Sequence, residues 1–460
     1  MSLHGLGRMP ILAPILTILK CQLLCAPHGE RNASIRVYQI LRRQMRAGLM
    51  RARWGRRLLP AAQRAGPECD MCFKEPVMVV ICGISAWYLH ATPPAIRDLS
   101  TLEEALSHEH GIVTFPRSNA NEGARAIAIR LATDLKGIPV PVHLMGDSLR
   151  SARASKLIVP HPLPSDLSPA DLIDLGNGLF VLSIERTLLD LARTETFVRL
   201  VQRCLEACGI YAVSAKTERA KAATSALVQS YLMSLSRPFP ITAYSDDAGR
   251  PLPLGDAWSD ASTWSPCVDR SGVFDGLWKR PPLTSCEKLS AFCARKEGVA
   301  GIRLLRRAVL SAHDGSGSPL ESQFYLFYGL SARLGGEGWP RPFLNRRVAL
   351  SEPARRIAGQ QSCVADALFP EQRGVIEVQG KRFHADRMGF EERNGRMAGL
   401  EAMGFQVFEV THEHMARLES LELRLESIAR KLGLPLARRT AAFIRRRREL
   451  FLEVFPHGVA

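Results

Sequence analysis

The sequence predicts a mixed α/β fold, and three features of the 460-residue chain support this prediction. Short apolar runs rich in β-branched residues, at 363–369 and 374–378, have the composition of strands. Other stretches, such as 283–312, carry apolar residues at helical spacing. With 46% hydrophobic residues the chain is able to bury a large core, so we expect two folded domains with less regular ends.

The first 76 residues are predicted to be a basic segment without a defined fold. Residues 9–26 are apolar but contain Pro10, Pro14 and Lys20, and they fall short of the roughly 20 apolar residues that a membrane span requires. Weak positive charge before this run and dense arginines after it also argue against an efficient signal peptide. We therefore expect a cytoplasmic protein with no membrane partner.

The cysteines do not form a disulfide framework, because eleven are spread over 460 residues. Cys69 and Cys72 are the only close pair with metal-type spacing, and no second pair or matching histidines accompany them, so we expect no zinc site. Cys204 and Cys208 share one helical face and are interpreted as small core residues.

An α+β domain is predicted over residues 77–245. Residues 81–90 begin with a short apolar run, and 140–147 and 179–182 supply further strands. Ser183 is expected to cap a helix that continues to Ala192. The simplest interpretation of Glu185, Arg186 and Asp190 is a helix start with an exposed ion pair.

The next two segments differ in composition. Residues 246–282 are rich in Ser, Asp, Gly, Pro and Trp without a sustained period, so a linker or long loop is predicted. Residues 283–312 then predict a helical run that begins the second predicted domain, over 283–435. Its core stripe is Leu289, Phe292, Ile302, Leu305 and Val309.

The strongest functional signal is a predicted hairpin that carries Asp366 and Glu377 on adjacent strands. Two acids held side by side in an apolar sheet repel each other unless a cation or a proton intervenes, and Mg²⁺ accepts a sparse carboxylate pair with waters as its other ligands. The alternative is a pair of solvated acids on an edge strand.

Three blocks of the C-terminal part, at 315–348, 364–384 and 392–411, carry a family resemblance. They read GSGSPLESQFYLFYGL with RLGGEGWPRPFLNRRV, then VADALFPEQRGVIEVQGKRFH, then ERNGRMAGLEAMGFQVFEVT. This part resembles endonuclease-like domains related to very-short-patch repair enzymes, within the PD-(D/E)XK nuclease superfamily. The resemblance implies a three-layer restriction-endonuclease-like domain, with a short central sheet flanked by helices, that acts on DNA with Mg²⁺.

The resemblance also implies a role for each site residue. Asp366 matches the metal-binding aspartate, Glu377 the second acid, His384 the histidine after the glycine turn, and Glu321 a helix carboxylate behind the metal. One position departs from the pattern, because Gln379 stands where the superfamily has Lys and this branch often has Asp. Gln neither ionises nor neutralises charge, so Lys381 could supply the cation instead, and a degenerate domain that binds DNA without cutting stays an alternative.

Several of these residues also have a purely structural explanation. Ser318, Pro319 and Glu321 form a capping-box pattern, so capping alone could account for Glu321. His384 could be an ordinary loop residue. Arg393 and Arg396 lie three apart on one predicted helix face, where they could hold a phosphate or simply be solvated.

The charge balance favours a nucleic-acid partner. Lys and Arg number 61 against 45 Asp and Glu, a formal net charge of +16, and the surplus gathers at both ends. The basic C-terminal segment 436–460 contains Arg445, Arg446, Arg447 and Arg448, which could contact DNA phosphates. Alternatively, the segment is a helix docked by an apolar stripe of Phe443, Ile444, Leu450, Phe451 and Val454.

The middle part carries a second resemblance, in SAWYLHATPP (85–94), PVHL (141–144) and SIERTLLDLA (183–192). It is similar to the C-terminal portion of abortive-infection antitoxins, which implies a DNA-binding regulator with a toxin or defence-system partner. Three function classes are therefore open: a Mg²⁺-dependent DNA endonuclease, a non-catalytic DNA-binding regulator of antitoxin type, and a protein-interaction module. No phosphate-binding loop or dinucleotide glycine pattern occurs, so no nucleotide cofactor is expected.

Overall fold

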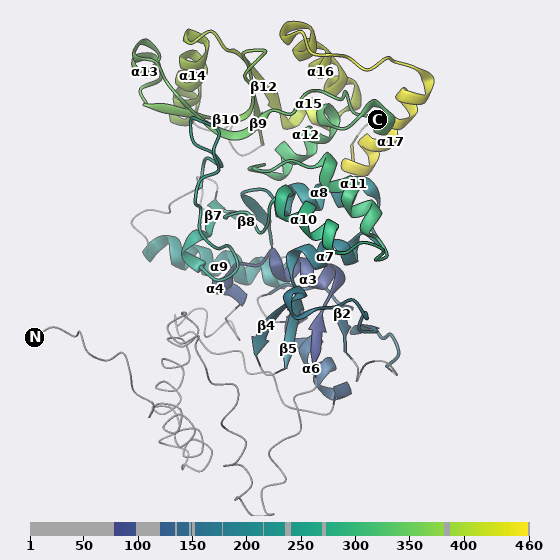
Figure 1. Cartoon of the computed structure of the whole chain (residues 1–460). Helices are drawn as coiled ribbons and strands as arrows, with labels where there is room; N and C mark the ends of the chain where they lie inside the picture. The colour runs from purple at the N-terminus through teal and green to yellow at the C-terminus, as the bar shows by residue number, and fades with distance from the viewer. Residues whose placement is uncertain are drawn as a thin grey trace, which may run out of the picture. The chain divides into compact units, whose positions relative to one another are not determined.

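A computed structural model of the chain describes residues 78–97, 120–133, 136–146, 149, 152–176, 178–214, 216–234, 241–268, 273–380 and 387–458. The chain divides into two compact units, Met1–Glu75 and Pro76–Ala460, and all of the described residues belong to the second. Helices occur together with three mixed or antiparallel sheets, which confirms the mixed α/β class (Figure 1).

The predictions for the N-terminal segment, including the apolar run 9–26 and the pair Cys69 and Cys72, lie outside the described residues. Among the helices that the structure describes, none combines the length and the apolar character that crossing a membrane requires.

The first sheet has five strands in the order β3-β2-β1-β5-β4. Ser183 ends the β5 strand and caps α7 by accepting a hydrogen bond from Arg186 N, as the sequence predicts. The sheet buries an apolar cluster that includes Val80, Leu144 and Val181. The elements of this part are β1 (Val79–Ile81), α3 (Gly83–His90), α4 (Pro94–Arg97), α6 (Ala120–Thr133), β2 (Val142–Met145), β3 (Ile158–His161), η4 (Pro169–Asp171), β4 (Leu172–Gly176), β5 (Leu179–Leu182) and α7 (Ile184–Leu191).

The segment predicted as a linker contains β7 (Ser265–Val268) and β8 (Phe274–Lys279), two strands of a small three-stranded sheet, so that prediction is wrong for these strands. The order is β6-β8-β7, with β8 antiparallel to both neighbours. Trp264, Phe274 and Trp278 are buried against one another, so aromatic packing stabilises a stretch whose Ser, Gly and Pro content suggests a loop. The elements are β6 (Tyr211–Val213), α9 (Glu218–Ser234), η5 (Ala261–Thr263), β7 (Ser265–Val268) and β8 (Phe274–Lys279).

A group of helices follows and shares the largest buried cluster of the described chain. The predicted run 283–312 forms two helices with a turn between them, and all five residues of its expected core stripe are buried. The same cluster contains Leu188 and Leu205 from the predicted α+β domain and Phe324 and Ile376 from the predicted nuclease domain, so these two parts have a common core. The helices are α8 (Phe197–Ala207), α10 (Cys286–Arg295), α11 (Ile302–Ser311) and α12 (Pro319–Gly329).

The third sheet, ordered β12-β11-β10-β9, carries the predicted hairpin. Val375 packs with Leu400 on one face, whereas Ile376 packs with Phe408 and Phe324 on the other, so helices cover both faces. This part therefore has a sheet flanked by helices, whereas the restriction-endonuclease-like assignment stays a prediction. The elements are η6 (Ala332–Leu334), β9 (Phe343–Ala349), α13 (Glu352–Ala358), β10 (Ser362–Phe369), β11 (Gly374–Gln379), α14 (Arg387–Ala402), β12 (Gln406–Thr411), α15 (His412–Ala416), α16 (Leu418–Leu432) and α17 (Ala441–Val454).

The basic C-terminal helix α17 packs through its apolar stripe, with two differences from the predicted pattern. Ile444 is exposed instead of docked, since it lies on the outer face of the helix. Arg447 is fully buried and forms an ion pair with Glu337, so it is not available to DNA. Arg445 and Arg448 are exposed and Arg446 is half-buried.

We predict that breaking the buried pair is strongly destabilising. Glu337 also accepts a hydrogen bond from Arg439 at 3.1 Å, so Arg447→Ala would leave a buried carboxylate only partly compensated and should cost about 3–5 kcal/mol in the free energy of unfolding. The exposed neighbour provides the control: Arg445→Ala should change it by less than about 0.5 kcal/mol. Urea unfolding of both variants checks this, and equal midpoints would contradict the assignment.

Candidate active site

The hairpin forms as predicted and opens where the two acids lie. Strands β10 and β11 pair antiparallel from Phe369↔Gly374 to Ala367↔Ile376, and the next positions in this register are Asp366 and Glu377. Instead of a further backbone pair, the Asp366 carboxylate accepts a hydrogen bond from Val378 N at 2.7 Å. One oxygen of Asp366 is therefore held against the β11 backbone.

Glu377 and Gln379 present buried oxygens that lack a hydrogen-bond partner among the residues that the structure describes. The two residues are only 6% and 7% exposed, and alternate strand positions place them on one face of β11. Glu377 Oε1 and Gln379 Oε1 have no partner among the described residues. A buried oxygen without a donor costs about 1–3 kcal/mol, and such groups commonly mark the position of an ion or water. Carboxylate and amide oxygens are ligands that suit a hard divalent cation.

Arg396 of α14 faces the same carboxylate. Its guanidinium lies 4.0 Å from Glu377 Oε2, and its side chain is 39% exposed, so it lies between the acid and solvent. Because the pairing is long and the arginine is accessible, Arg396 could still contact a phosphate. Arg393 lies on the same helix, but its side chain is outside the described part of the chain.

Glu321 acts first as a structural anchor. Ser318 caps α12 by accepting a hydrogen bond from Glu321 N at 3.2 Å, as predicted. The Glu321 carboxylate does not bond the Ser318 backbone N–H, however. Its Oε2 accepts from Gly317 N and from Asn345 Nδ2, each at 2.7 Å. A role as a metal ligand would therefore fall to its other oxygen.

Close packing around Gly317 fixes this loop. A Cβ at this position would lie 2.8 Å from Asn345 Oδ1, so only glycine fits. Asn345 itself is buried with φ at 45° and also donates to Gly315 O at 2.9 Å. The start of α12 is thus tied to β9 at the edge of the candidate site.

The acids of the site shift their pKa values upward. Burial raises the pKa of Asp366 well above its ordinary value, and the negative charges of Glu377 and Glu321 add to this effect. Burial likewise raises the pKa of Glu377 to about 7, with Arg396 opposing the increase. Perturbed carboxyl groups of this kind are typical of metal and catalytic sites, although structural networks can also produce them.

Lys279 is a functional candidate that sequence reasoning missed. It is half-buried at the end of β8, its Nζ donates to Gly317 O at 2.5 Å, and its charge lowers the pKa of Asp366 against the prevailing increase. The residue lies in the segment predicted as a linker. In the sequence, the aromatic residues Phe274 and Trp278 are the signal that could have indicated a strand here. The structure places both on β8, where they are buried.

The carboxylates do not form a closed three-ligand group. Three metal-type donor atoms lie within 4.8 Å of one another at one place in the described ranges, and they belong to Cys208, Cys286 and Asp314. Asp366, Glu377 and Glu321 do not meet this distance. His384 and Lys381, which the resemblance and the sequence place in the site, fall outside the described residues.

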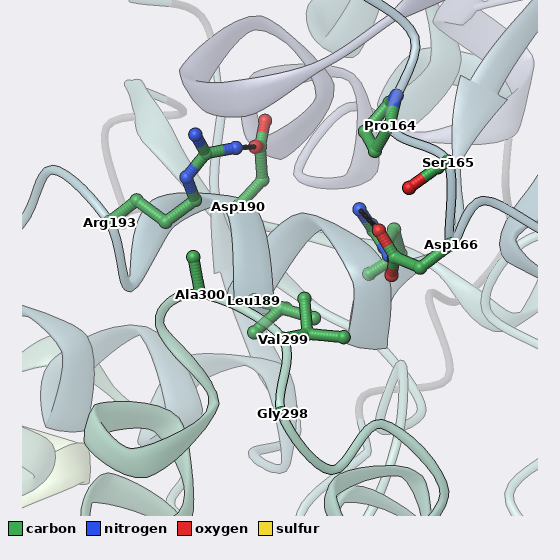
Figure 2. Close-up of a pocket in the computed structure, with 10 residues that line it drawn as sticks. Pro164, Ser165, Asp166, Leu189, Asp190, Arg193, Gly298, Val299 and Ala300 are labelled. Carbon is green, nitrogen blue, oxygen red and sulfur yellow. Dashed lines mark hydrogen bonds and ion pairs between the residues drawn. The ribbon is translucent and has the colours of Figure 1, made fainter.

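A separate pocket of about 290 Å³ lies beside α7 (Figure 2). In this pocket Arg186 is buried and bonds the Asp166 carboxylate. The interpretation of Arg186 as half of an exposed ion pair is therefore wrong. Asp190 accepts from Gly83 N at 2.9 Å and lies 3.8 Å from Arg193. The charges of this pocket are paired with one another, so it gives no preference for an anion or a cation.

Comparison with protein-family models, with curated proteins and with solved structures yields no match for this chain. Both family resemblances therefore stay predictions.

The raised pKa of Glu377 predicts a pH-dependent stability. The native state holds this proton up to about pH 7, whereas the unfolded chain releases it near pH 4.5, so the Glu377 contribution to stability falls as the pH rises between these values. The total loss is of order 3 kcal/mol, since a tenfold change in proton affinity corresponds to about 1.4 kcal/mol.

Glu377→Gln should remove this loss. In metal-free buffer, urea unfolding should show the variant gaining stability over the wild type between pH 5 and pH 8. A constant difference across this range would contradict the assignment. Adding Mg²⁺ at pH 8 should narrow the gap, because a bound cation stabilises the ionised wild-type carboxylate.

Proposed function

We propose that the part of the chain containing the third sheet is a divalent-metal-dependent DNA endonuclease, with Asp366 and Glu377 as its metal-binding acids. The observation that carries the proposal is the pair of buried oxygens of Glu377 and Gln379, which have no hydrogen-bond partner in the described part of the chain and lie near the Asp366 carboxyl. Oxygen donors in a partly enclosed site are the coordination that Mg²⁺ accepts, with waters as the remaining ligands.

The residues have distinct roles in this proposal. Glu377 Oε1 and the free oxygen of Asp366 would hold the ion, and the Gln379 amide would orient a water. When bound, Mg²⁺ supplies charge stabilisation and a more acidic water for attack on phosphorus. Arg396 lies at the exposed side of Glu377, where it would position the phosphate.

Lys279 supports the activity despite the missing signature lysine. Gln379 supplies no charge, whereas Lys279 brings an ammonium group close enough to Asp366 to affect its ionisation. It would offset negative charge that develops on the phosphate, the task otherwise expected of Lys381. The net charge of +16 and the exposed Arg445 and Arg448 support binding of the DNA backbone.

Conservative variants of the acids test the proposal. With Mg²⁺, Asp366→Asn and Glu377→Gln should each lower cleavage of plasmid, nicked or mismatched DNA by at least about 100-fold, because each removes a charged metal ligand. Glu371→Gln changes an exposed acid in the turn of the same hairpin and should leave cleavage unchanged. Equal cleavage by all four proteins would refute the site.

The contribution of Lys279 is tested separately. Lys279→Gln should lower the cleavage rate by about 10-fold or more while DNA affinity stays within about 2-fold, since the charge acts at the reacting phosphate. Lys279→Arg should restore part of the rate. Lys288→Gln, an exposed lysine on α10, is the control. A loss of affinity without loss of rate would assign Lys279 to binding alone.

A non-catalytic DNA-binding regulator is the second candidate, and two observations favour it. Gln379 replaces the charged signature residue, and one oxygen each of Asp366 and Glu321 is already occupied by protein donors. Gel-shift binding that needs no metal, together with no cleavage by the wild type under any divalent ion, would support this candidate. A toxin or defence-system partner belongs to it as an expectation from the antitoxin resemblance.

A further inference from the structure

A second group of metal-type donors lies outside the candidate nuclease site, where three elements meet. Cys208 ends α8, Cys286 is the first residue of α10, and Asp314 lies in the loop between α11 and α12. Their two sulfurs and one carboxylate oxygen all lie within 4.8 Å of one another, and the sulfurs are 4.0 Å apart.

Backbone hydrogen bonds hold the three residues in this arrangement. Asp314 Oδ1 accepts from Cys286 N at 2.8 Å, which fixes the carboxylate at the start of α10. Gly315 N donates to Cys208 O at 3.0 Å, so the loop is also fixed to the end of α8. The three residues that carry the metal-type donor atoms are therefore held together by hydrogen bonds from the backbone.

The separations suit a tetrahedral metal better than a disulfide. Two thiolates at about 2.3 Å from one Zn²⁺ lie roughly 3.8 Å apart, close to the distance between Cys208 Sγ and Cys286 Sγ, whereas a disulfide requires about 2.05 Å. Cys286 and Asp314 are half-buried, so an ion could enter from solvent and keep a water as its fourth ligand.

We propose that Cys208, Cys286 and Asp314 form a binding site for Zn²⁺ or a similar thiophilic divalent cation. Sulfur with one carboxylate oxygen is a donor set typical of zinc and not of Mg²⁺. Because a thiol must lose its proton to bind a metal, binding should weaken as the pH falls.

The ion would connect two helices to the loop that leads into Ser318 and Glu321. It would therefore stabilise the start of α12 without contacting Asp366 or Glu377. This inference is independent of the proposed nuclease activity, and the experiment separates the two.

Cobalt binding to the full chain under reducing conditions tests the site. The wild type should bind about one equivalent of Co²⁺ that shows the thiolate charge-transfer absorption of a sulfur-ligated ion, in addition to any ion at the proposed nuclease site, and Zn²⁺ should displace it. Cys208→Ser and Cys286→Ser should abolish this absorption, and Asp314→Asn should weaken affinity at least 10-fold. Cys267→Ser, a half-buried cysteine in β7, should bind Co²⁺ as the wild type does, and Asp366→Asn should leave the thiolate absorption unchanged.

Several results would overturn the proposal. The wild type could show no thiolate absorption, Asp366→Asn could remove it, or mass spectrometry could find Cys208 and Cys286 joined as a disulfide that excludes metal. Circular dichroism checks that each variant folds. If a cysteine variant does not fold, Asp314→Asn decides, since its ligand loss leaves both thiols in place.

A rise in the melting temperature of the wild type with Zn²⁺ that Asp314→Asn lacks would support the site, and identical rises would contradict it.

Discussion

The hydrogen bonds of the Glu321 carboxylate are the interaction on which the candidate site depends. One oxygen receives donors from the backbone of Gly317 and from the side chain of Asn345, and so it fixes α12, β9 and the loop before the helix in one position. Lys279 binds the carbonyl of Gly317 from a different sheet. A helix cap, a strand of the third sheet and a cation from the second sheet are thereby held together beside Asp366. Local capping uses the backbone N–H of Glu321 and assembly of the site uses its carboxylate, so one residue serves both.

Burial of acids is the main energetic cost of this arrangement. Asp366 and Glu377 occupy neighbouring strands of a sheet covered on both faces, and their pKa values rise because water is largely excluded. Protein donors compensate this cost in part, through Val378 N at Asp366 and Arg396 at Glu377. The compensation is incomplete, since Glu377 Oε1 and Gln379 Oε1 have no partner within the described residues. A divalent cation would supply the missing partner of these oxygens, and the proposed metal-dependent function rests on this.

A shared core explains why the parts of residues 76–460 behave as one compact unit. The largest buried cluster contains α7 and α8 from the predicted α+β domain together with α12 and the third sheet. The proposed zinc site lies within this junction. Its residues Cys208, Cys286 and Asp314 are held by hydrogen bonds from backbone N–H groups. A metal ion there would strengthen the same contacts that position the start of α12. The two candidate sites thus share one structural support while using different donor chemistry.

The sequence by itself determined the local features of this protein. Strand composition with a turn between the strands predicted the hairpin of Asp366 and Glu377, and the pattern Ser318-Pro319 predicted the cap of α12. Helical spacing predicted most of the buried stripe of α17. Each of these features depends on residues within a few positions of one another. Only the tertiary structure decided which partners these elements meet. Asn345 bonds Glu321 over a separation of 24 residues, and Lys279 bonds Gly317 over 38. Arg447 is buried against Glu337 over 110 residues. No local pattern encodes such distant contacts, because they result from how the elements pack.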